Sequence, residues 1–131
     1  GPRPAGFSVN INNITMPCQK PPWSHLTAVD TTTGDIAWRI PLGITEGLSA
    51  RRQNTGRPGR AAALVTANNL LFIASTDDNR LRALSATSGD ILWEQLLERR
   101  GNANPMTYMG NDNKQYLVIA ASDKLVGYSL P

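Results

Sequence analysis

The stretch Leu64–Leu97 reads LVTANNLLFIASTDDNRLRALSATSGDILWEQLL. Its four short apolar runs, rich in Val, Ile, Leu and Phe, are separated by Asn, Asp, Ser and Gly. Short runs punctuated in this way indicate antiparallel β-strands joined by turns rather than helices. The expected strands are Val65–Ala67, Leu70–Ser75, Leu81–Ser85 and Ile91–Leu96. The stretch therefore predicts one four-stranded antiparallel sheet in which sequential strands are neighbours.

Part of this stretch repeats an earlier part of the chain. The segment Ala83-Leu-Ser-Ala-Thr-Ser-Gly-Asp-Ile-Leu-Trp93 matches Ala28-Val-Asp-Thr-Thr-Thr-Gly-Asp-Ile-Ala-Trp38, with Ala, Thr, Gly, Asp, Ile and Trp at the same offsets. Each residue of the second copy follows its counterpart by 55 positions, as Ala83 follows Ala28. A repeat of this length with four strands per unit indicates the blades of a β-propeller, which bury their faces against one another. The alternative, two similar hairpins in a β-sandwich, is disfavoured by the shared Trp spacing.

Composition narrows the classes of function. The chain has 131 residues, a formal net charge of +3 and one cysteine, Cys18. A lone cysteine excludes an internal disulfide and a cysteine-rich metal site. No apolar run approaches the length of a membrane-spanning helix, and no signal peptide is expected at the start. Basic residues cluster within Arg51–Arg60 and at Arg99–Arg100, but no aromatic residues interleave with them, so we expect solvated loops and no nucleic-acid partner.

The repeat divides the rest of the chain into predicted segments. Residues 1–23 contain five of the nine prolines and predict an extended loop, with one weak strand around Phe7–Ile11. Further strands are expected over Leu26–Asp30, Ile36–Ile40, Asn104–Met109, Gln115–Ala121 and Lys124–Leu130. The predicted segments are 1–23, an extended loop; 24–43, the outer half of one blade; 44–60, a Gly- and Arg-rich linker; 61–97, a complete blade; and 98–131, an incomplete last blade. A ring cannot close on this number of strands.

Motifs spread along the chain carry a resemblance to a known family. They include Pro21-Pro-Trp-Ser-His-Leu-Thr-Ala-Val-Asp-Thr-Thr-Thr-Gly34, Leu71-Phe-Ile-Ala-Ser-Thr76, Arg82-Ala-Leu, Pro105-Met-Thr-Tyr108, Lys114-Gln-Tyr-Leu-Val-Ile-Ala-Ala121 and Leu125-Val-Gly-Tyr-Ser-Leu-Pro131. Taken in order, they resemble the C-terminal part of the pyrroloquinoline quinone (PQQ) dependent dehydrogenases, the membrane-type glucose and alcohol dehydrogenase quinoproteins. The resemblance implies an all-β fragment of a periplasmic oxidoreductase, with about two blades of an eight-bladed propeller.

The resemblance also implies where the chemistry lies. In this family PQQ sits over the central channel and is held by a divalent metal, usually calcium. The metal ligands and the catalytic aspartate lie upstream of the matching part, so we expect no catalytic and no metal-binding residue here. The parent would oxidise a small sugar or alcohol, the rest of the parent propeller would be the partner of this chain, and the chain alone is expected to be inactive.

One loop could still contribute to the cofactor pocket. The family approaches PQQ through a glycine-rich stretch before an inner strand, and Gln53–Ala63 is the matching position here. Amide and guanidinium groups there could bind the PQQ carboxylates, for which charge-assisted hydrogen bonds are suited; an ordinary surface turn is the alternative. The sequence departs from the family at Ala61–Ala63, where glycines are commoner, and at Ser122–Lys124, where some relatives have a Gly-Gly-His segment. The candidate cofactor-binding residues are Asn54, Gly56, Arg57 and Arg60.

Other candidate residues have simpler interpretations. His25 has no Cys, Asp or Glu at ligand spacing, so we expect a surface or packing residue. The Asp77–Asn79 segment lacks the pattern of a calcium-binding loop and is expected to form a polar turn. Trp38 and Trp93 occupy equivalent positions of the repeat, which favours packing between units over a binding surface.

A second hypothesis about function belongs to a different class. A stand-alone module built from blade sequences would leave strand edges open, and open edges pair with further strands. Such a module would self-associate or bind a partner through these edges, and four chains of two blades each could rebuild a ring.

Overall fold

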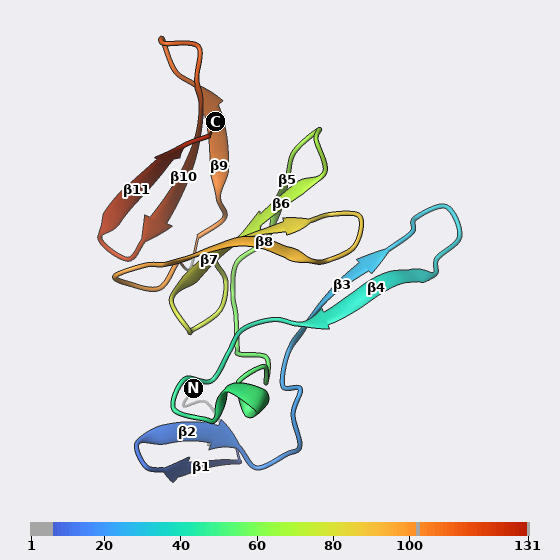
Figure 1. Cartoon of the computed structure of the whole chain (residues 1–131), viewed down its shortest axis with the longest axis vertical. Helices are drawn as coiled ribbons and strands as arrows, with labels where there is room; N and C mark the ends of the chain where they lie inside the picture. Colours follow the sequence, from blue (N-terminus) through green and yellow to red (C-terminus); the bar gives the residue numbers. More distant parts are fainter. Residues whose placement is uncertain (1–6, 102, 131) are drawn as a thin grey trace, which may run out of the picture.

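The structure is a computed structural model that describes residues 7–101 and 103–130 (Figure 1). These residues form eleven β-strands and a short 3-10 helix, η1 (Ala50–Arg52). The strands are β1 (Ser8–Ile11), β2 (Ile14–Pro17), β3 (His25–Val29), β4 (Ile36–Pro41), β5 (Leu64–Val65), β6 (Leu70–Ile73), β7 (Arg80–Ser85), β8 (Ile91–Leu96), β9 (Met106–Met109), β10 (Gln115–Ala121) and β11 (Lys124–Ser129). They make four antiparallel sheets, in the orders β1-β2, β3-β4, β5-β6-β7-β8 and β11-β10-β9. The predicted all-β fold is confirmed.

The four-stranded sheet forms within Leu64–Leu97, as predicted. Strands β7 and β8 pair from Arg80 opposite Leu96 to Leu84 opposite Ile91. Strand β8 has the predicted bounds, whereas β5 is shorter than expected and ends at Val65. Asn69 turns the chain between β5 and β6 with a φ of 58°, a conformation that Asn tolerates better than most residues.

The two copies of the repeat form the same type of hairpin. In each copy the register shifts beside the shared alanine, between Ala28 and Val29 in β3 and between Ala83 and Leu84 in β7. A glycine closes each turn in the same way. The Gly34 amide donates to the carbonyl of Asp30 at 2.7 Å, and the Gly89 amide donates to the equivalent carbonyl of Ser85 at 2.8 Å.

The segment before Trp23 differs from the prediction. An extended loop with one weak strand was expected, but β1 and β2 form a hairpin in which Val9 faces Met16. Asn12 and Asn13 make the turn with φ values of 52° and 64°. Positive φ at both central residues is the geometry of a tight two-residue hairpin turn, which Asn can adopt although Asn-Gly is the usual signal. The strand expected around Phe7–Ile11 is therefore present as β1, the loop expected over residues 12–17 was wrong, and residues 1–6 lie outside the described part of the chain.

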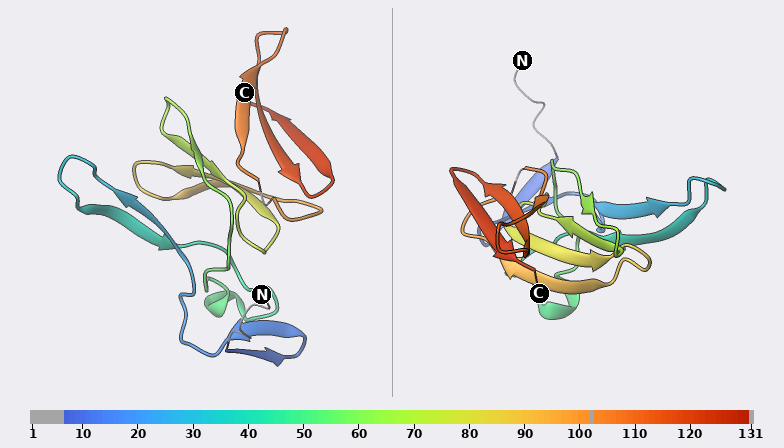
Figure 2. Two further views of the ribbon diagram at one scale, coloured as in Figure 1. Left: turned by 180° about the vertical axis from the view of Figure 1, so that it is seen from behind. Right: turned by 90° about the horizontal axis from the view of Figure 1, so that it is seen from above.

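Hydrophobic side chains cover both faces of the four-stranded sheet. Side chains alternate between the faces of a strand, so Leu71 and Ile73 of β6 lie on one face and Phe72 on the other. The first face packs on the β3-β4 hairpin through a cluster comprising Leu42, Leu71, Ile73 and Leu84, against which Leu26, Trp38, Ile40 and Ala86 lie. The second face packs on the three-stranded sheet through Phe72, Ala74, Leu81, Ala83, Leu97, Leu117, Ile119 and Ala121. Figure 2 shows the same arrangement, with the four-stranded sheet between its neighbours.

No helix in the described residues is long and apolar enough to cross a membrane.

Candidate functional site

The segment that leads into β5 is folded back on itself, although the sequence shows no core pattern there. The Arg57 amide donates to the carbonyl of Leu42 at 2.7 Å, and the Gly56 amide donates to that of Gly43 at 2.9 Å. The hydroxyls of Thr45 and Thr55, both buried, lie 2.7 Å apart. The predicted linker is therefore a fixed loop, and its residues hold defined positions next to the four-stranded sheet.

Gly56 allows this loop to pack closely on the segment before β3. Its φ is +69°, and a Cβ added to it would lie 2.3 Å from the carbonyl oxygen of Ser24. A side chain at this position would therefore collide with backbone, which gives the glycine a structural reason to be there. The Ser24 hydroxyl lies next to it, 2.8 Å from the carbonyl oxygen of Arg57.

Arg57 is bound to the four-stranded sheet. Its Nε and Nη2 donate to the two carboxylate oxygens of Asp77 at 2.6 and 2.8 Å, a bidentate geometry that fixes both groups. Its Nη1 also donates to the carbonyl of Thr15 in β2 at 3.2 Å. The guanidinium therefore ties the loop, the β6-β7 turn and the N-terminal hairpin together.

Asn54 and Arg60 are more exposed to solvent than Gly56 and Arg57. The Arg60 backbone amide donates to the carbonyl of Ser75 at 3.2 Å, and Gly59 forms an isolated antiparallel bridge with Thr76. The loop therefore adds to the sheet by backbone pairing while the side chains of Asn54 and Arg60 face solvent. Of the four candidate residues, these two present polar side chains that a ligand could reach, and contact with a cofactor stays a prediction for all four.

A buried ion-pair network that the sequence pattern did not predict lies beside this loop. The side chains of Arg82 and Asp78 are 1% and 2% exposed and pair with each other. Arg82 also donates to the Thr76 hydroxyl at 3.0 Å and pairs through Nε with Glu94 at 2.8 Å. A charged residue inside the run Leu81–Leu84 was the available signal, because an arginine in a buried strand requires an acidic partner.

Asp78 joins the network to the loop. One of its oxygens accepts a hydrogen bond from the Ile44 amide at 2.9 Å. Burial alone would raise the pKa of Asp78. The hydrogen bond and charge of Arg82 outweigh burial, with further hydrogen bonds from Thr76 and the Ile44 amide, so the pKa lies below its ordinary value. Asp78 is therefore a carboxylate at neutral pH and connects the loop to the sheet.

The Asp77–Asn79 segment forms the expected polar turn, with Asn79 at a φ of 56°. Each of its two carboxylates pairs with an arginine, Asp77 with Arg57 and Asp78 with Arg82. Within residues 7–101 and 103–130, no three His, Cys, Asp or Glu side chains are grouped so that they could hold a metal ion.

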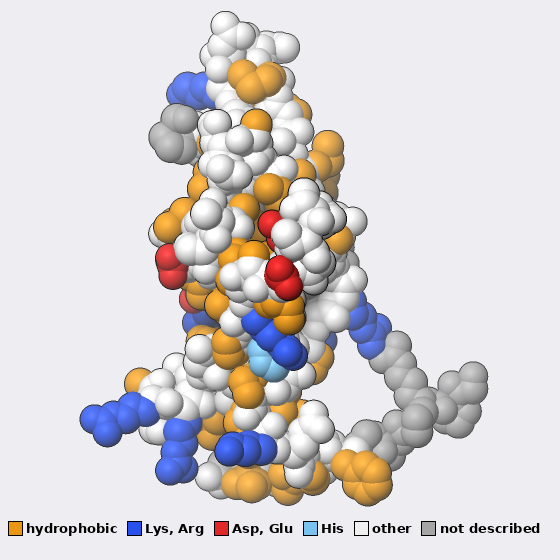
Figure 3. Space-filling view, turned by 90° about the vertical axis from the view of Figure 1, so that its right-hand side faces the viewer, with side chains coloured by type: hydrophobic (Ala, Val, Ile, Leu, Met, Phe, Trp, Pro, Cys, Tyr) orange, Lys and Arg blue, Asp and Glu red, His pale blue; other side chains and the backbone are white. Residues whose placement is uncertain are grey.

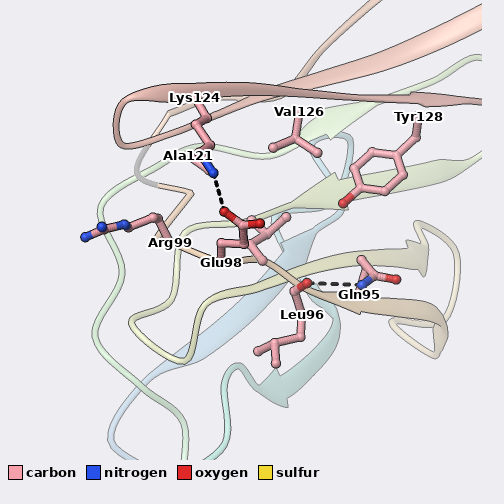
Figure 4. A pocket seen from close by; sticks show the side chains of 9 residues that line it. Gln95, Leu96, Glu98, Arg99, Ala121, Lys124, Val126 and Tyr128 are labelled. Atoms are coloured by element: carbon pink, nitrogen blue, oxygen red, sulfur yellow. Dashed lines mark hydrogen bonds and ion pairs between the residues drawn. The ribbon is translucent and has the colours of Figure 1, made fainter.

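A pocket of about 330 Å³ lies between the end of β8 and the β10-β11 hairpin (Figure 4). Val126 and Tyr128 line it, as do Lys124 and Glu98, which form an ion pair with each other. The hydrogen bond and charge of Lys124 hold the pKa of Glu98 below its usual range. Both charged groups are exposed and paired with each other, so we assign no catalytic role to this pocket.

An antiparallel four-stranded sheet that packs other sheets on both faces is the arrangement of blades in a β-propeller. Comparison with solved structures gives the same class. A europium-containing methanol dehydrogenase superposes with a TM-score of 0.56 and 27% identity over 72% of this chain and 14% of that protein. BamB from Moraxella catarrhalis superposes with a TM-score of 0.53 over 94% of this chain and 30% of that protein, and at 21% identity it supports the fold alone.

Sequence comparison then gives the family. Residues 3–117 match the family described as PQQ, glucose/ethanol/alcohol dehydrogenase, beta-propeller domain. The chain is 36% identical over 140 residues to quinoprotein glucose dehydrogenase A of Acinetobacter calcoaceticus, covering 95% of this chain and 17% of that protein. It is also 36% identical over 129 residues to the quinate/shikimate dehydrogenase (quinone) of Acinetobacter baylyi, covering 88% of this chain and 16% of that protein. The chain belongs to the PQQ-dependent dehydrogenase β-propeller family, and it spans about a sixth of the length of these two relatives.

Proposed function

We propose that this chain supplies the last blades of a PQQ-dependent sugar or alcohol dehydrogenase, as scaffold and as one side of the cofactor pocket. PQQ, when bound, takes up the two electrons removed from the substrate. The observation that supports a pocket role is the fixed loop before β5, which holds Asn54 and Arg60 with exposed polar side chains. These donors suit the carboxylates of PQQ, because guanidinium and amide groups form strong hydrogen bonds with anions.

The proposal assigns different roles to the four candidate residues. Asn54 and Arg60 would contact the cofactor directly. Arg57 would position the loop through its bidentate pair with Asp77, and Gly56 would allow the close approach of the loop to Ser24. Calcium and the catalytic base would come from other parts of the parent, and the chain alone would not oxidise sugars or alcohols. The parent would work in the periplasm, where quinoprotein dehydrogenases of this type are expected.

The division into blades is part of the same proposal. Residues 24–43 would form the outer half of one blade, residues 61–97 a complete blade and residues 98–131 an incomplete last blade, with residues 44–60 linking the first two. The three-stranded order β11-β10-β9 supports the last assignment, because one more strand beside β11 would complete a four-stranded blade. The rest of the parent propeller would provide that strand.

A titration of the 131-residue chain with PQQ, in the presence of calcium, tests the pocket role. Trp23 is a natural reporter, because its backbone amide donates to the carbonyl of Thr55 in the candidate loop at 2.6 Å. We expect weak, saturable quenching of tryptophan fluorescence that is weakened by Arg60→Ala and by Asn54→Ala, and unchanged in the exposed control Arg51→Ala. Quenching that is equal in all three variants would reject these contacts. We also expect the isolated chain to be inactive. Reduction of a redox dye by this chain in the presence of glucose or ethanol would contradict that expectation.

The second candidate function, self-association, is supported by apolar side chains at the open edges. Leu125 in β11 is 78% exposed and Met109 at the end of β9 is 63% exposed. The β1-β2 end adds Phe7, which is 92% exposed, and Figure 3 shows hydrophobic side chains among basic ones at this lower end of the molecule. Light scattering after gel filtration gives the test. A defined oligomer that becomes monomeric in Leu125→Lys supports the module, whereas a monomer near 14.2 kDa rejects it.

A further inference from the structure

A small cavity lies at the end of the four-stranded sheet where β5 begins and β6 ends. Its volume is about 180 Å³, and three separate segments line it: the loop before β5, the β6-β7 turn and the loop before β9. Its lining residues are Pro58, Gly59, Arg60, Ser75, Asp77 and Arg100. The cavity has room for a carboxylate with part of the molecule that carries it, since one water takes about 30 Å³ in the liquid.

The charges around this cavity are unequal. The single carboxylate, Asp77, is already paired with both Nε and Nη2 of Arg57 on one side. Arg100 lies farther away, with its Nη2 at 3.7 Å from the Asp77 carboxylate, beyond hydrogen-bond distance. Neither the Arg60 nor the Arg100 side chain donates a hydrogen bond to a residue that the structure describes. Asp77 therefore faces the guanidinium groups of both Arg57 and Arg100 with a single negative charge, and with Arg60 added the residues around the cavity carry a net positive charge.

A hydroxyl lines the same cavity. Ser75 is 6% exposed as a residue, and within the described part of the chain no buried side-chain N or O atom is left without a partner, so its Oγ is not an orphaned buried group but a polar atom of the cavity wall. Its Oγ faces Gly59, where an added Cβ would lie 2.8 Å from it. A serine hydroxyl in a cavity wall can donate one hydrogen bond to an acceptor in the cavity. An acceptor oxygen between the two guanidinium groups would be a suitable partner for it.

From these observations we infer that Arg60, Arg100 and Ser75 form a subsite for the carboxylate of an organic acid. A carboxylate offers two oxygens to the guanidinium groups and an acceptor to the hydroxyl. The carboxylate has two possible sources, the quinone cofactor and a hydroxy-acid substrate. The assignment of these sources rests on the proposed function, whereas the subsite itself rests on the cavity and its charges.

Quinate is the probe, with glucose as the uncharged control. We expect quinate, at constant ionic strength set with sodium chloride, to shift the side-chain Nε–H signals of Arg60 and Arg100 saturably in heteronuclear NMR spectra of the 131-residue chain. The signals of Arg51 and Arg52 in η1 should not move. Shifts of all arginines together, no saturable shift, or equal shifts with glucose would each overturn the subsite.

Two adjacent arginines give a matched pair of variants. Arg99→Ala and Arg100→Ala change the net charge equally, but only Arg100 lines this cavity. We expect Arg100→Ala to weaken quinate binding about tenfold, because it removes a charge-assisted hydrogen bond. Arg99→Ala should leave quinate binding almost unchanged. Equal weakening by both variants would show a general charge effect and overturn the proposal. Ser75→Ala should weaken binding less than Arg100→Ala, with the backbone spectrum preserved.

A titration with PQQ distinguishes the two sources. If PQQ moves the same signals and displaces quinate, the subsite holds a cofactor carboxylate. If quinate moves them and PQQ does not, the subsite holds a substrate carboxylate, and the pocket role in the proposed function fails while the subsite stands.

Discussion

The motif at residues 28–38 and its copy at residues 83–93 have nearly the same backbone but different surroundings. An added Cβ at Gly34 would meet no atom within 4 Å, whereas at Gly89 it would lie 2.8 Å from the ring of Trp38. Trp38 of the first copy therefore covers the turn of the second, and its Nε1 donates to the carbonyl of Ala86 at 2.9 Å. Trp93 of the second copy instead makes an edge-to-face contact with Tyr128, with ring centroids 5.4 Å apart.

The comparison separates what local sequence determines from what stacking determines. Turn, bulge and strand pairing recur in both copies because the same residues make them. Burial differs, because the second copy has a sheet on each side and the first has one. Leu84 is fully buried, whereas its counterpart Val29 is 53% exposed. The expectation that both Trp residues pack between units is confirmed, and Trp38 makes the closer contact.

The largest expected difference between the copies lies at Arg82 and its counterpart Thr27. Arg82→Ala would leave the buried Asp78 carboxylate without its cation, and we expect a loss of about 3–5 kcal/mol in the free energy of unfolding. Thr27 is exposed, so Thr27→Ala should change it by less than about 1 kcal/mol. Urea unfolding followed by circular dichroism measures both. Similar losses in the two variants would show that the buried pair does not hold the four-stranded sheet.

The two Trp residues give the next largest difference. Trp38→Ala removes a half-buried ring and its hydrogen bond to Ala86, and we expect a loss of about 3 kcal/mol. Trp93 is 39% exposed, so Trp93→Ala should lose about 1–2 kcal/mol for its apolar burial and its contact with Tyr128. The same urea titration applies. A larger loss from Trp93→Ala would reverse the order of the two contacts.

The two glycines test the stacking contact itself. Gly34→Ala should lose about 1 kcal/mol, the cost of a left-handed conformation for a residue with a Cβ. Gly89→Ala should lose about 2–3 kcal/mol, because the new methyl group also displaces the Trp38 ring. A double-mutant cycle gives the decisive comparison. In the Trp38→Ala background the two substitutions should become equal, and a difference that persists would show another cause.

The smallest expected difference is in the response to acid. The pKa of Asp78 is lowered in the folded chain, so its contribution to stability is present above its unfolded pKa of about 3.9 and is lost as pH falls through the folded value. The stability gap between the wild-type chain and Arg82→Ala should therefore narrow below about pH 4. Asp30 also has a lowered pKa, through its hydrogen bond to Thr32, but it is exposed. As a control, Asp30→Asn should leave the pH dependence of stability nearly unchanged. A stability gap between the wild-type chain and Arg82→Ala that stays constant from pH 5 to about pH 3 would contradict the role of Asp78.

The sequence was sufficient for the repeat and for most of the strands, because both depend on short-range patterns. Strands β8 and β10 have the predicted bounds, and the polar turn at Asp77–Asn79 is where it was expected. The β1-β2 hairpin was missed because prolines dominate the pattern and Asn12-Asn13 is a weaker turn signal than Asn-Gly. A closer weighing of two consecutive Asn residues could have predicted it.

The candidate site was less predictable, because its geometry depends on residues far apart in the chain. Spacing alone did not show that Asp77 would occupy the guanidinium of Arg57, or that Gly56 would lie against Ser24. It also did not bring Arg100 to the same cavity as Arg60. These contacts form only when the loops before β5 and β9 meet at one end of the sheet.

The central claim is that this chain serves as the last blades of a PQQ-dependent dehydrogenase. The most direct measurement is PQQ binding by a chimera in which this chain replaces the matching segment of the Acinetobacter calcoaceticus quinoprotein glucose dehydrogenase A. We predict that the chimera binds PQQ and that Trp38→Ala weakens binding more than Trp93→Ala. A chimera with the thermal unfolding profile and circular dichroism spectrum of the host protein that binds no PQQ would contradict the claim.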